Sequence, residues 1–142
     1  MRVCIFVMLN PSTADANLDD PTIRRCISFA MREGCGALWV INLFSFRATE
    51  PKDMKNAADP HGPRNDQVLD EVLGYAKRYG HLVIVGWGAH GTYKSADLHV
   101  AALANKHQIT LHCFGTTGVG QPRHPLYVKG DTPLMEWKPT PH

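Results

Sequence analysis

Apolar residues occur along the chain in short unbroken runs that alternate with longer amphipathic segments. The runs are rich in β-branched residues and uniformly apolar, as expected of strands that are covered on both faces. Such alternation is typical of a parallel sheet with crossover helices. We therefore predict an α/β fold, a three-layer doubly wound sheet, with about four parallel strands at Val3–Leu9, Ala37–Phe44, Leu82–Gly86 and Ile109–Phe114.

Three segments between these runs have the spacing of amphipathic helices. The first is predicted to begin after Asp20 as its cap, with Pro21 at the first position, and to end near Gly34. Its apolar face consists of Ile23, Cys26, Ile27 and Ala30. The second runs from about residue 65 to 79 and stops at Gly80, with an apolar face made of Val68, Leu69, Val72, Leu73 and Ala76. The third spans about residues 95–105.

The length of 142 residues fits one domain, 1–142, with a proline-containing tail from about residue 131 that has few apolar residues to dock it. A net charge of +2 does not by itself indicate a nucleic-acid-binding protein. The four cysteines form no CxxC pair, so we expect buried reduced thiols and a cytoplasmic setting, without a zinc site. The apolar runs are too short for a membrane span, and the first indicates a strand rather than a signal peptide.

Polar residues follow the predicted strand ends. In a parallel α/β sheet, ligands bind outside the carboxyl ends of the strands, so segments far apart in sequence converge on one pocket. The segments concerned are 9–13 (Leu-Asn-Pro-Ser-Thr), 40–44 (Val-Ile-Asn-Leu-Phe), 85–90 (Val-Gly-Trp-Gly-Ala-His) and 124–127 (His-Pro-Leu-Tyr). A further stretch of about twenty residues, 47–63, has little periodicity, and such long segments are more often functional than idle.

These four segments, taken in order, resemble motifs of the uracil-DNA glycosylase superfamily, whose fold is a small doubly wound sheet. The resemblance implies that Asn10 positions the attacking water, that Asn42 reads a flipped base and that His124 is the catalytic histidine. Residues 8–15, 19–25 and 122–127 also look like a compact bacterial and phage family without an established function. The chain differs from a typical glycosylase in its short length, in Leu126 where Ser is usual, and in lacking the iron-sulfur cysteines of some branches.

The residue types fit this chemistry, because breaking an N-glycosidic bond releases a base that leaves with negative charge and gains from a fixed donor. His124 suits that role, Asn10 can orient a water through its amide oxygen, and Asp15 is the nearest candidate base. Structural alternatives remain open for each motif. His124 would then bond a loop carbonyl, segment 10–13 would be a strand-ending turn, and Asn42 would bridge strand and loop.

Further residues near the strand ends are candidates for contact with a base or with DNA. Phe44 and Phe46 are candidates for base stacking, although most aromatic residues near apolar strands belong to the core. Leu126 is a candidate wedge during base flipping. For Arg24 and Arg25, a solvated helix face is favoured over a phosphate contact. The full set of candidate phosphate or DNA contacts is Ser12, Thr13, Arg47, Trp87, Gly88, His90, Lys94, Arg123, Leu126 and Tyr127.

Three functions follow from this pattern. The first is a DNA-binding hydrolase that cleaves the N-glycosidic bond of a flipped, modified or deaminated base in single- or double-stranded DNA. The second is a non-catalytic reader of modified or damaged DNA, and the third is an enzyme acting on a nucleoside or nucleotide. We expect no cofactor and no metal, because the glycine-rich segment 86–91 matches neither a P-loop nor a dinucleotide fingerprint. The sequence leaves the oligomeric state open.

Overall fold

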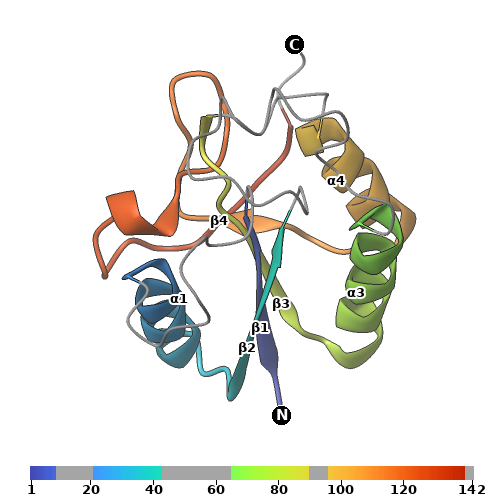
Figure 1. Cartoon of the computed structure of the whole chain (residues 1–142), viewed down its shortest axis with the longest axis horizontal. Helices are drawn as coiled ribbons and strands as arrows, with labels where there is room; N and C mark the ends of the chain where they lie inside the picture. Colours follow the sequence, from blue (N-terminus) through green and yellow to red (C-terminus); the bar gives the residue numbers. More distant parts are fainter. Residues whose placement is uncertain (9–20, 43–64, 90–95, 140–142) are drawn as a thin grey trace.

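A computed structural model describes residues 1–8, 21–42, 65–89 and 96–139 of the chain. Its sheet has the strand order β2-β1-β3-β4-β5, in which β2, β1, β3 and β4 are parallel and β5 is antiparallel to β4 (Figure 1). The strands are β1 (Val3–Met8), β2 (Ala37–Asn42), β3 (Leu82–Val85), β4 (His112–Cys113) and β5 (Met135–Glu136). The helices are α1 (Pro21–Arg32), α3 (Asn65–Tyr79) and α4 (Ala96–Lys106), with a 3-10 turn, η2 (Pro125–Tyr127).

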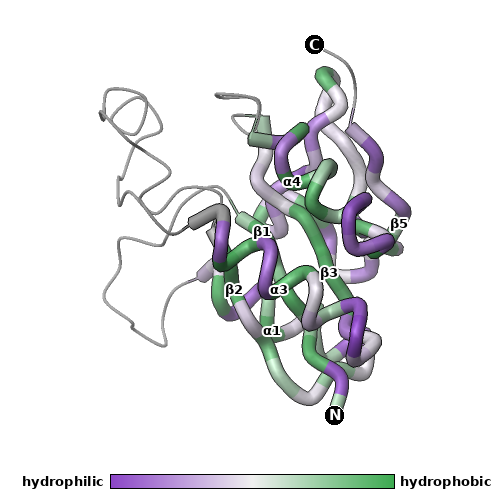
Figure 2. The backbone as a smooth tube through the Cα atoms, turned by 90° about the vertical axis from the view of Figure 1, so that its right-hand side faces the viewer, coloured by the Kyte–Doolittle hydropathy of each residue, from purple (hydrophilic) through white to green (hydrophobic). Residues whose placement is uncertain are grey.

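The fold has three layers, because helices cover both faces of the sheet. Successive residues of β1 point to opposite faces, so Val3, Ile5 and Val7 pack with α3 and α4 while Cys4 and Phe6 pack with α1. Every residue of β1 and β3 is buried, as expected of central strands. Figure 2 shows the hydrophobic residues concentrated along these two strands. The predicted α/β class with a doubly wound, mostly parallel sheet is confirmed.

The helix predictions agree closely with the structure. The second predicted helix matches α3, and the third matches α4 to within one residue at each end. Gly34 and Gly80, placed after the first two helices, have φ of +75° and +71°, the left-handed conformation that glycine adopts when it ends a helix. The predicted cap, Asp20, lies outside the described residues, as do Leu9, Leu43 and the long segment 47–63.

Two residues assigned to apolar helix faces were wrongly placed. Ile27 of α1 is 41% exposed, and Phe29 takes its place in the core. Val68 of α3 is 39% exposed, whereas Leu69, Leu73 and Ala76 are buried. In both helices the apolar stripe is broader than the surface that the sheet covers.

The sheet itself differs from the prediction at its C-terminal edge. The strand expected over residues 109–114 is only His112–Cys113, and the tail contributes a fifth strand that was not predicted. The N–H of Trp137 donates to the carbonyl of Leu111 at 2.8 Å, and its indole N–H donates to the carbonyl of Gly120 at 3.1 Å. Trp137 is 4% exposed, so this one buried side chain docks a tail whose sequence has little strand character.

All four cysteines are buried and take part in no disulfide bond, which confirms the prediction of buried thiols. Burial raises the pKa of the Cys4 thiol, and the neighbouring Cys35 and Cys26 raise it further. Burial likewise raises the pKa of Cys113. Both thiols are therefore held in the protonated, unreactive form. Across the described residues, none of the helices has the length and apolar character needed to cross a membrane.

Candidate functional site

The strand order places a topological switch point between β1 and β3. The connection after β1 carries α1 over one face of the sheet, while α3 and α4 lie on the other face (Figure 1). In doubly wound sheets, ligands bind in the crevice at the carboxyl ends of the strands on either side of such a point. The topology therefore locates the candidate site beside Met8, the last residue of β1, and Gly86, the residue after β3.

Gly86 brings the ends of three strands against the His-Pro segment. Its N–H donates to the carbonyl of Val7 at 3.0 Å. A Cβ at this position would lie 3.0 Å from Cδ of Pro125, 3.4 Å from the carbonyl oxygen of Arg123 and 3.6 Å from Sδ of Met8. Met8 is in turn the register partner of Asn42 at the end of β2. A side chain here would push these neighbours apart by a few tenths of an ångström, so glycine favours the close approach of segments that are far apart in sequence.

His124 caps the turn η2, and its ring has a defined hydrogen-bonding state. Its Nδ1 accepts a hydrogen bond from the backbone N–H of Leu126 at 3.2 Å. In the neutral imidazole the proton then resides on Nε2, because one nitrogen accepts while the other donates. The ring is partly buried, and its centroid lies 5.6 Å from that of Tyr127. With Nδ1 accepting, Nε2 is the nitrogen that carries the donor hydrogen of the neutral ring.

Two arginines of helix α1 bond the backbone of this turn and of the residues that follow it. The Nε of Arg25 donates to the carbonyl of Pro125 at 3.3 Å, and a terminal nitrogen of the same guanidinium donates to the carbonyl of Val128. Arg32 donates to the carbonyls of Gly130 at 3.1 Å and Thr132 at 2.6 Å. The prediction of a solvated helix face holds for the exposed Arg24 but is wrong for Arg25, which bonds the loop that carries His124.

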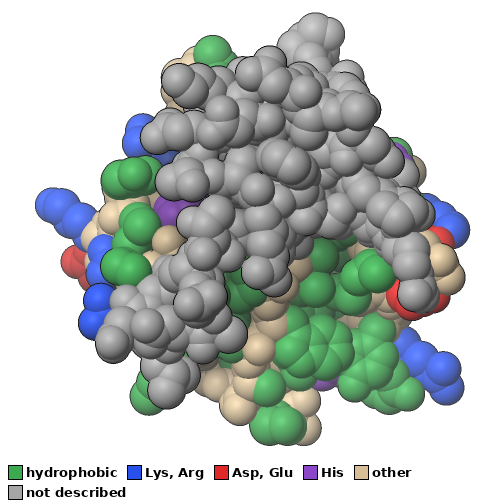
Figure 3. Space-filling view, in the orientation of Figure 1, with side chains coloured by type: hydrophobic (Ala, Val, Ile, Leu, Met, Phe, Trp, Pro, Cys, Tyr) green, Lys and Arg blue, Asp and Glu red, His purple; other side chains and the backbone are tan. Residues whose placement is uncertain are grey.

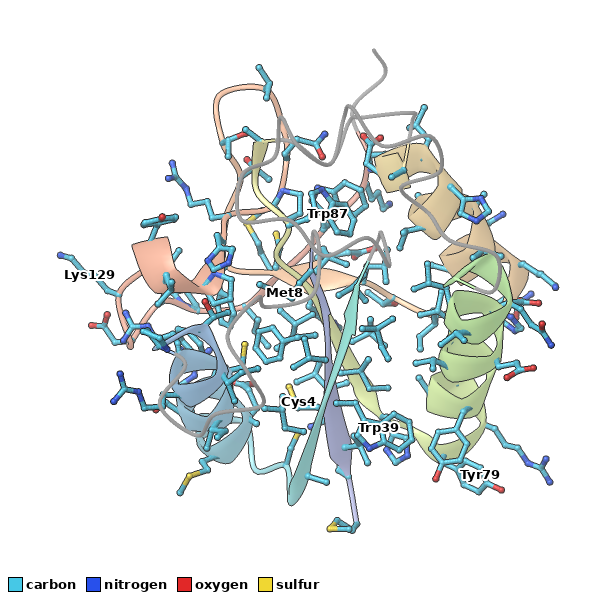
Figure 4. The ribbon with its side chains drawn as sticks, viewed as in Figure 1. Cys4, Met8, Trp39, Tyr79, Trp87 and Lys129 are labelled. Atoms are coloured by element: carbon cyan, nitrogen blue, oxygen red, sulfur yellow. The ribbon has the colours of Figure 1, made fainter. Side chains whose placement is uncertain are left out.

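The opposite side of the same loop is fixed by a buried polar chain. The indole N–H of Trp87 donates to Oε1 of Gln121 at 2.7 Å, and Nε2 of Gln121 donates to Oδ2 of Asp97 at 3.0 Å. Trp87 is 2% exposed, and it packs edge-to-face against Trp137. Figure 4 shows Trp87 among side chains in the interior. The prediction that Trp87 contacts DNA is therefore wrong, because its ring lies in the core and its only polar group bonds Gln121.

Four other predicted contact residues lie in or beside the loop that carries His124. Tyr127 is 80% exposed and Leu126 is 38% exposed, so both belong to the surface. Arg123 is also exposed, with its backbone N–H bonded to the carbonyl of Gly115 at 3.0 Å. Gly88 has φ of +76°, and its N–H donates to the carbonyl of Pro122 at 2.9 Å. The structure thus places a cation, an aromatic ring and an apolar side chain near His124.

The remaining predicted residues lie outside the described part of the chain, and for Asn42 only the backbone is described. They are Asn10, Ser12, Thr13, Asp15, Phe44, Phe46, Arg47, His90 and Lys94. Met8 and Asn42 immediately precede two of these segments and end at the same edge of the sheet. Of these two strand ends, Met8 is the one that lies close to Gly86, the residue packed against Pro125.

Within the described residues, no group of three or more His, Cys, Asp and Glu side chains is arranged to bind a metal ion. A groove of about 620 Å³ lies between α4 and the tail, where Leu98, Ala101, Trp137 and Lys138 contribute to its lining. None of its lining residues belongs to the switch point, so this groove is separate from the candidate site.

Sequence reasoning missed the residues that position the site. Arg25 stands in a helix whose pattern gives no sign of a long-range bond, and Gln121 lies in a polar Gly-Gln-Pro loop where a buried amide has no sequence signal. Asp97 does carry a signal, since an acidic residue in the first turn of a helix is favoured there. That signal explains the position of Asp97 along the helix but not its complete burial.

The fold and this site define an α/β protein whose His-Pro loop packs at the switch point of a doubly wound sheet. The chain belongs to the family described as "Protein of unknown function (DUF1643)", which it matches over residues 1–126. The matched range includes β1 through His124 and ends before β5. No curated protein and no solved structure gave a match to the chain.

Proposed function

We propose that this protein binds DNA and hydrolyses the N-glycosidic bond of a flipped, modified or deaminated base, on a fold of the uracil-DNA glycosylase type. The observation that carries the proposal is the state of His124. Its Nδ1 accepts the N–H of Leu126, so the neutral ring offers Nε2–H as a donor beside the switch point. Such a donor stabilises the negative charge that develops on the departing base.

The roles of the other groups follow from the order of the reaction. Asn10 holds the attacking water through its amide oxygen, with Asp15 as the group that takes its proton. Asn42 pairs with the edge of the flipped base, and Phe44 or Phe46 stacks on its face. The bond between the sugar and the base breaks with its electrons going to the base, and water adds to the sugar carbon. This chemistry uses no redox step.

The surface around His124 supports contact with DNA rather than with a small enclosed substrate. Arg123, Leu126 and Tyr127 are all exposed and lie within three residues of His124 in the sequence, so one loop offers a phosphate partner, a wedge and a stacking group. Phosphate contacts position a duplex, and an apolar wedge helps to unstack the base that is flipped.

The direct test is base excision from defined substrates. Oligonucleotides carrying uracil, hydroxymethyluracil, hypoxanthine or a mismatch are incubated with the protein, and abasic sites are detected as alkali-labile breaks. We expect cleavage of at least one substrate, and a loss of about 10²- to 10³-fold in the single-turnover rate for His124→Ala. Asn10→Ala is expected to lose the activity as well, whereas Lys138→Ala, with an 81% exposed side chain on the tail, retains it.

The outcomes separate this proposal from its two alternatives. Selective binding of a modified oligonucleotide without any cleavage would replace hydrolysis by recognition. Cleavage of free nucleosides with no action on oligonucleotides would assign the site to small-molecule metabolism. Cleavage that persists at the wild-type rate in both His124→Ala and Asn10→Ala would reject the roles given to these residues.

A glycine pair tests whether the position of His124 matters. Gly86→Ala places a methyl group 3.0 Å from Cδ of Pro125, so the turn must shift by a few tenths of an ångström. Gly118→Ala introduces the same methyl group where no atom lies within 4 Å. We expect the first variant to lower the excision rate by about tenfold, since small misplacements of catalytic groups are costly, and the second to leave it unchanged.

A further inference from the structure

A layer of aromatic rings lies on the surface where α3 meets β2. It consists of Trp39, Tyr75, Tyr79 and His81, which we call the aromatic platform. The ring centroids of Trp39 and Tyr75 are 5.2 Å apart, and those of Tyr75 and Tyr79 are 4.6 Å apart. His81 lies 5.1 Å from Tyr75 and 6.3 Å from Trp39. These separations are those of interacting rings, so the four side chains form one continuous surface.

The platform is open to solvent. Trp39 is 37% exposed, Tyr75 is 41% exposed and Tyr79 is 55% exposed. Figure 3 shows hydrophobic side chains gathered on the lower right of the molecule, with Lys and Arg side chains beyond them. In the same orientation, Figure 4 places the labelled Trp39 and Tyr79 in that region. Adjacent exposed rings are unusual, because aromatic residues normally bury their faces when they pack a core.

This surface lies at the opposite end of the sheet from His124. Nδ1 of His81 accepts the backbone N–H of Val3 at 3.0 Å, which anchors the platform at the amino ends of β1 and β3. The candidate site lies at the carboxyl ends of the same strands. The proposed base-excision chemistry therefore gives the platform no role.

The charges around the platform are mainly positive. The guanidinium carbon of Arg78 lies 5.4 Å from the ring centroid of Tyr79, a cation–π distance. The exposed Arg2 directly precedes Val3, the residue whose N–H is bonded to His81. Glu71, one turn before Tyr75, accepts a hydrogen bond from Gln67 at 3.3 Å. The partner that fits such a surface has flat rings and negative charge.

We propose that the aromatic platform binds single-stranded nucleic acid by stacking its bases on Trp39, Tyr75 and Tyr79 while Arg78 and Arg2 meet the phosphates. Stacking platforms flanked by cations bind single strands in this way, with little sequence preference. A second copy of the chain is a poorer fit. A two-fold contact would bring Arg2 and Arg78 near their own counterparts, and like charges opposed across an interface are repulsive.

Tryptophan fluorescence gives a direct readout. Trp87 and Trp137 are 2% and 4% exposed, so a ligand that stacks on the protein surface reaches Trp39. Titration with oligo(dT) or oligo(rU) of about 12 nucleotides is expected to quench this emission, and the two sugars separate DNA from RNA as the preferred strand. Trp39→Phe should abolish most of the quenching while preserving binding measured by anisotropy of a labelled strand.

Substitutions of exposed residues test the contacts without disturbing the core. We expect Tyr79→Ala to weaken binding about tenfold, and Arg78→Ala to weaken it and to flatten the dependence of affinity on salt. The matched controls are Met31→Ala, an exposed apolar residue of α1, and Lys138→Ala on the tail. Both controls should bind the strands as the wild type does.

The proposal does not depend on base excision, so a failure of strand binding can be told apart from a failure of the excision activity. His124→Ala should leave binding to the platform unchanged, whereas Tyr79→Ala should leave the chemical step at His124 unchanged. Equal affinity of the wild type, Tyr79→Ala and Arg78→Ala for both strands would overturn the platform as a nucleic-acid surface. A dimer detected by sedimentation that is lost in Tyr79→Ala, without strand binding by the wild type, would assign the surface to self-association instead.

Discussion

The core between α1 and the sheet is aromatic, and the rings of Phe29 and Phe114 lie 4.1 Å apart in it. The core on the other face, where α3 and α4 pack, consists mainly of aliphatic side chains such as Leu73 of α3 and Val100 of α4. The two layers also differ in their polar contacts. On the α1 side, guanidinium groups reach across to backbone carbonyls, and on the other side a buried amide bridges Trp87 and Asp97.

Both sets of contacts end on the same segment, residues 121–132. Gln121 fixes it from the α4 side, and Arg25 and Arg32 fix it from the α1 side. The sheet and its cores therefore provide stability, while long polar side chains from both layers set the position of His124. Disrupting a core should lower the stability of the whole domain. Disrupting the bonds from Arg25 and Arg32, which we call the arginine clamp, should act mainly on the His-Pro turn.

The largest expected effect is in the aromatic core. Phe114→Ala removes a ring that is 2% exposed and contacts Phe29, and should reduce the free energy of unfolding by about 3 to 5 kcal/mol. Leu73→Ala, in the aliphatic layer, should cost about 2 to 5 kcal/mol. Chemical denaturation measures both. If Phe114→Ala cost less than the exposed Val119→Ala, the aromatic layer would not be a packed core.

The buried amide comes next. Gln121→Leu leaves the indole N–H of Trp87 and the carboxylate of Asp97 without their shared partner, at a cost of about 2 to 3 kcal/mol. Gln67→Leu, which removes an exposed amide from α3, is the control and should change stability by less than about 0.5 kcal/mol. Equal stability of the two variants in urea denaturation would show that the polar chain does not contribute.

The arginine clamp should have a smaller effect on stability than on the site. Arg25→Ala removes the bonds to Pro125 and Val128 and should cost about 1 kcal/mol, since the group is only partly buried. Hydrogen exchange of the amides of residues 126–128 should rise more than that of β1. Arg24→Ala, on the exposed face of the same helix, should alter neither quantity.

The smallest effect is expected at the surface of the other layer. His107 and Lys106 of the α4 region bond the Asp70 carboxylate of α3 at 2.6 Å and 3.0 Å, and they lower its pKa. A carboxylate with a lowered pKa in the folded state stabilises the fold above its unfolded pKa of about 4, and this contribution is lost as the pH falls through the folded pKa. Thermal melting of Asp70→Asn should therefore approach that of the wild type in acid. A difference in melting temperature between Asp70→Asn and the wild type that grows as the pH falls would contradict this assignment. Glu71→Gln, which changes the neighbouring carboxylate, is the control.

Sequence patterns predicted the elements well wherever local chemistry and burial agree. Strand β1 is apolar throughout because both of its faces are covered, and α3 ends at Gly80 because glycine adopts a positive φ without strain. The expectation of a site at the carboxyl ends of the strands also came from the pattern alone, and it stays a prediction. The burial of the cysteines was expected because three of the four lie in or beside apolar runs, and the structure buries all four.

The tertiary structure decided what depends on contacts between distant residues. The tail forms β5 because Trp137 is buried beside Leu111 and Gly120 and bonds both of their carbonyls. Trp87 lies in the core because Gln121 accepts its indole N–H. Arg25 looked solvated from its helix but reaches carbonyls about 100 residues away. Sequence periodicity records which face of an element is apolar, because that depends on neighbours within a few residues. It carries no record of which distant polar group completes a hydrogen bond, since only the folded chain brings the two together.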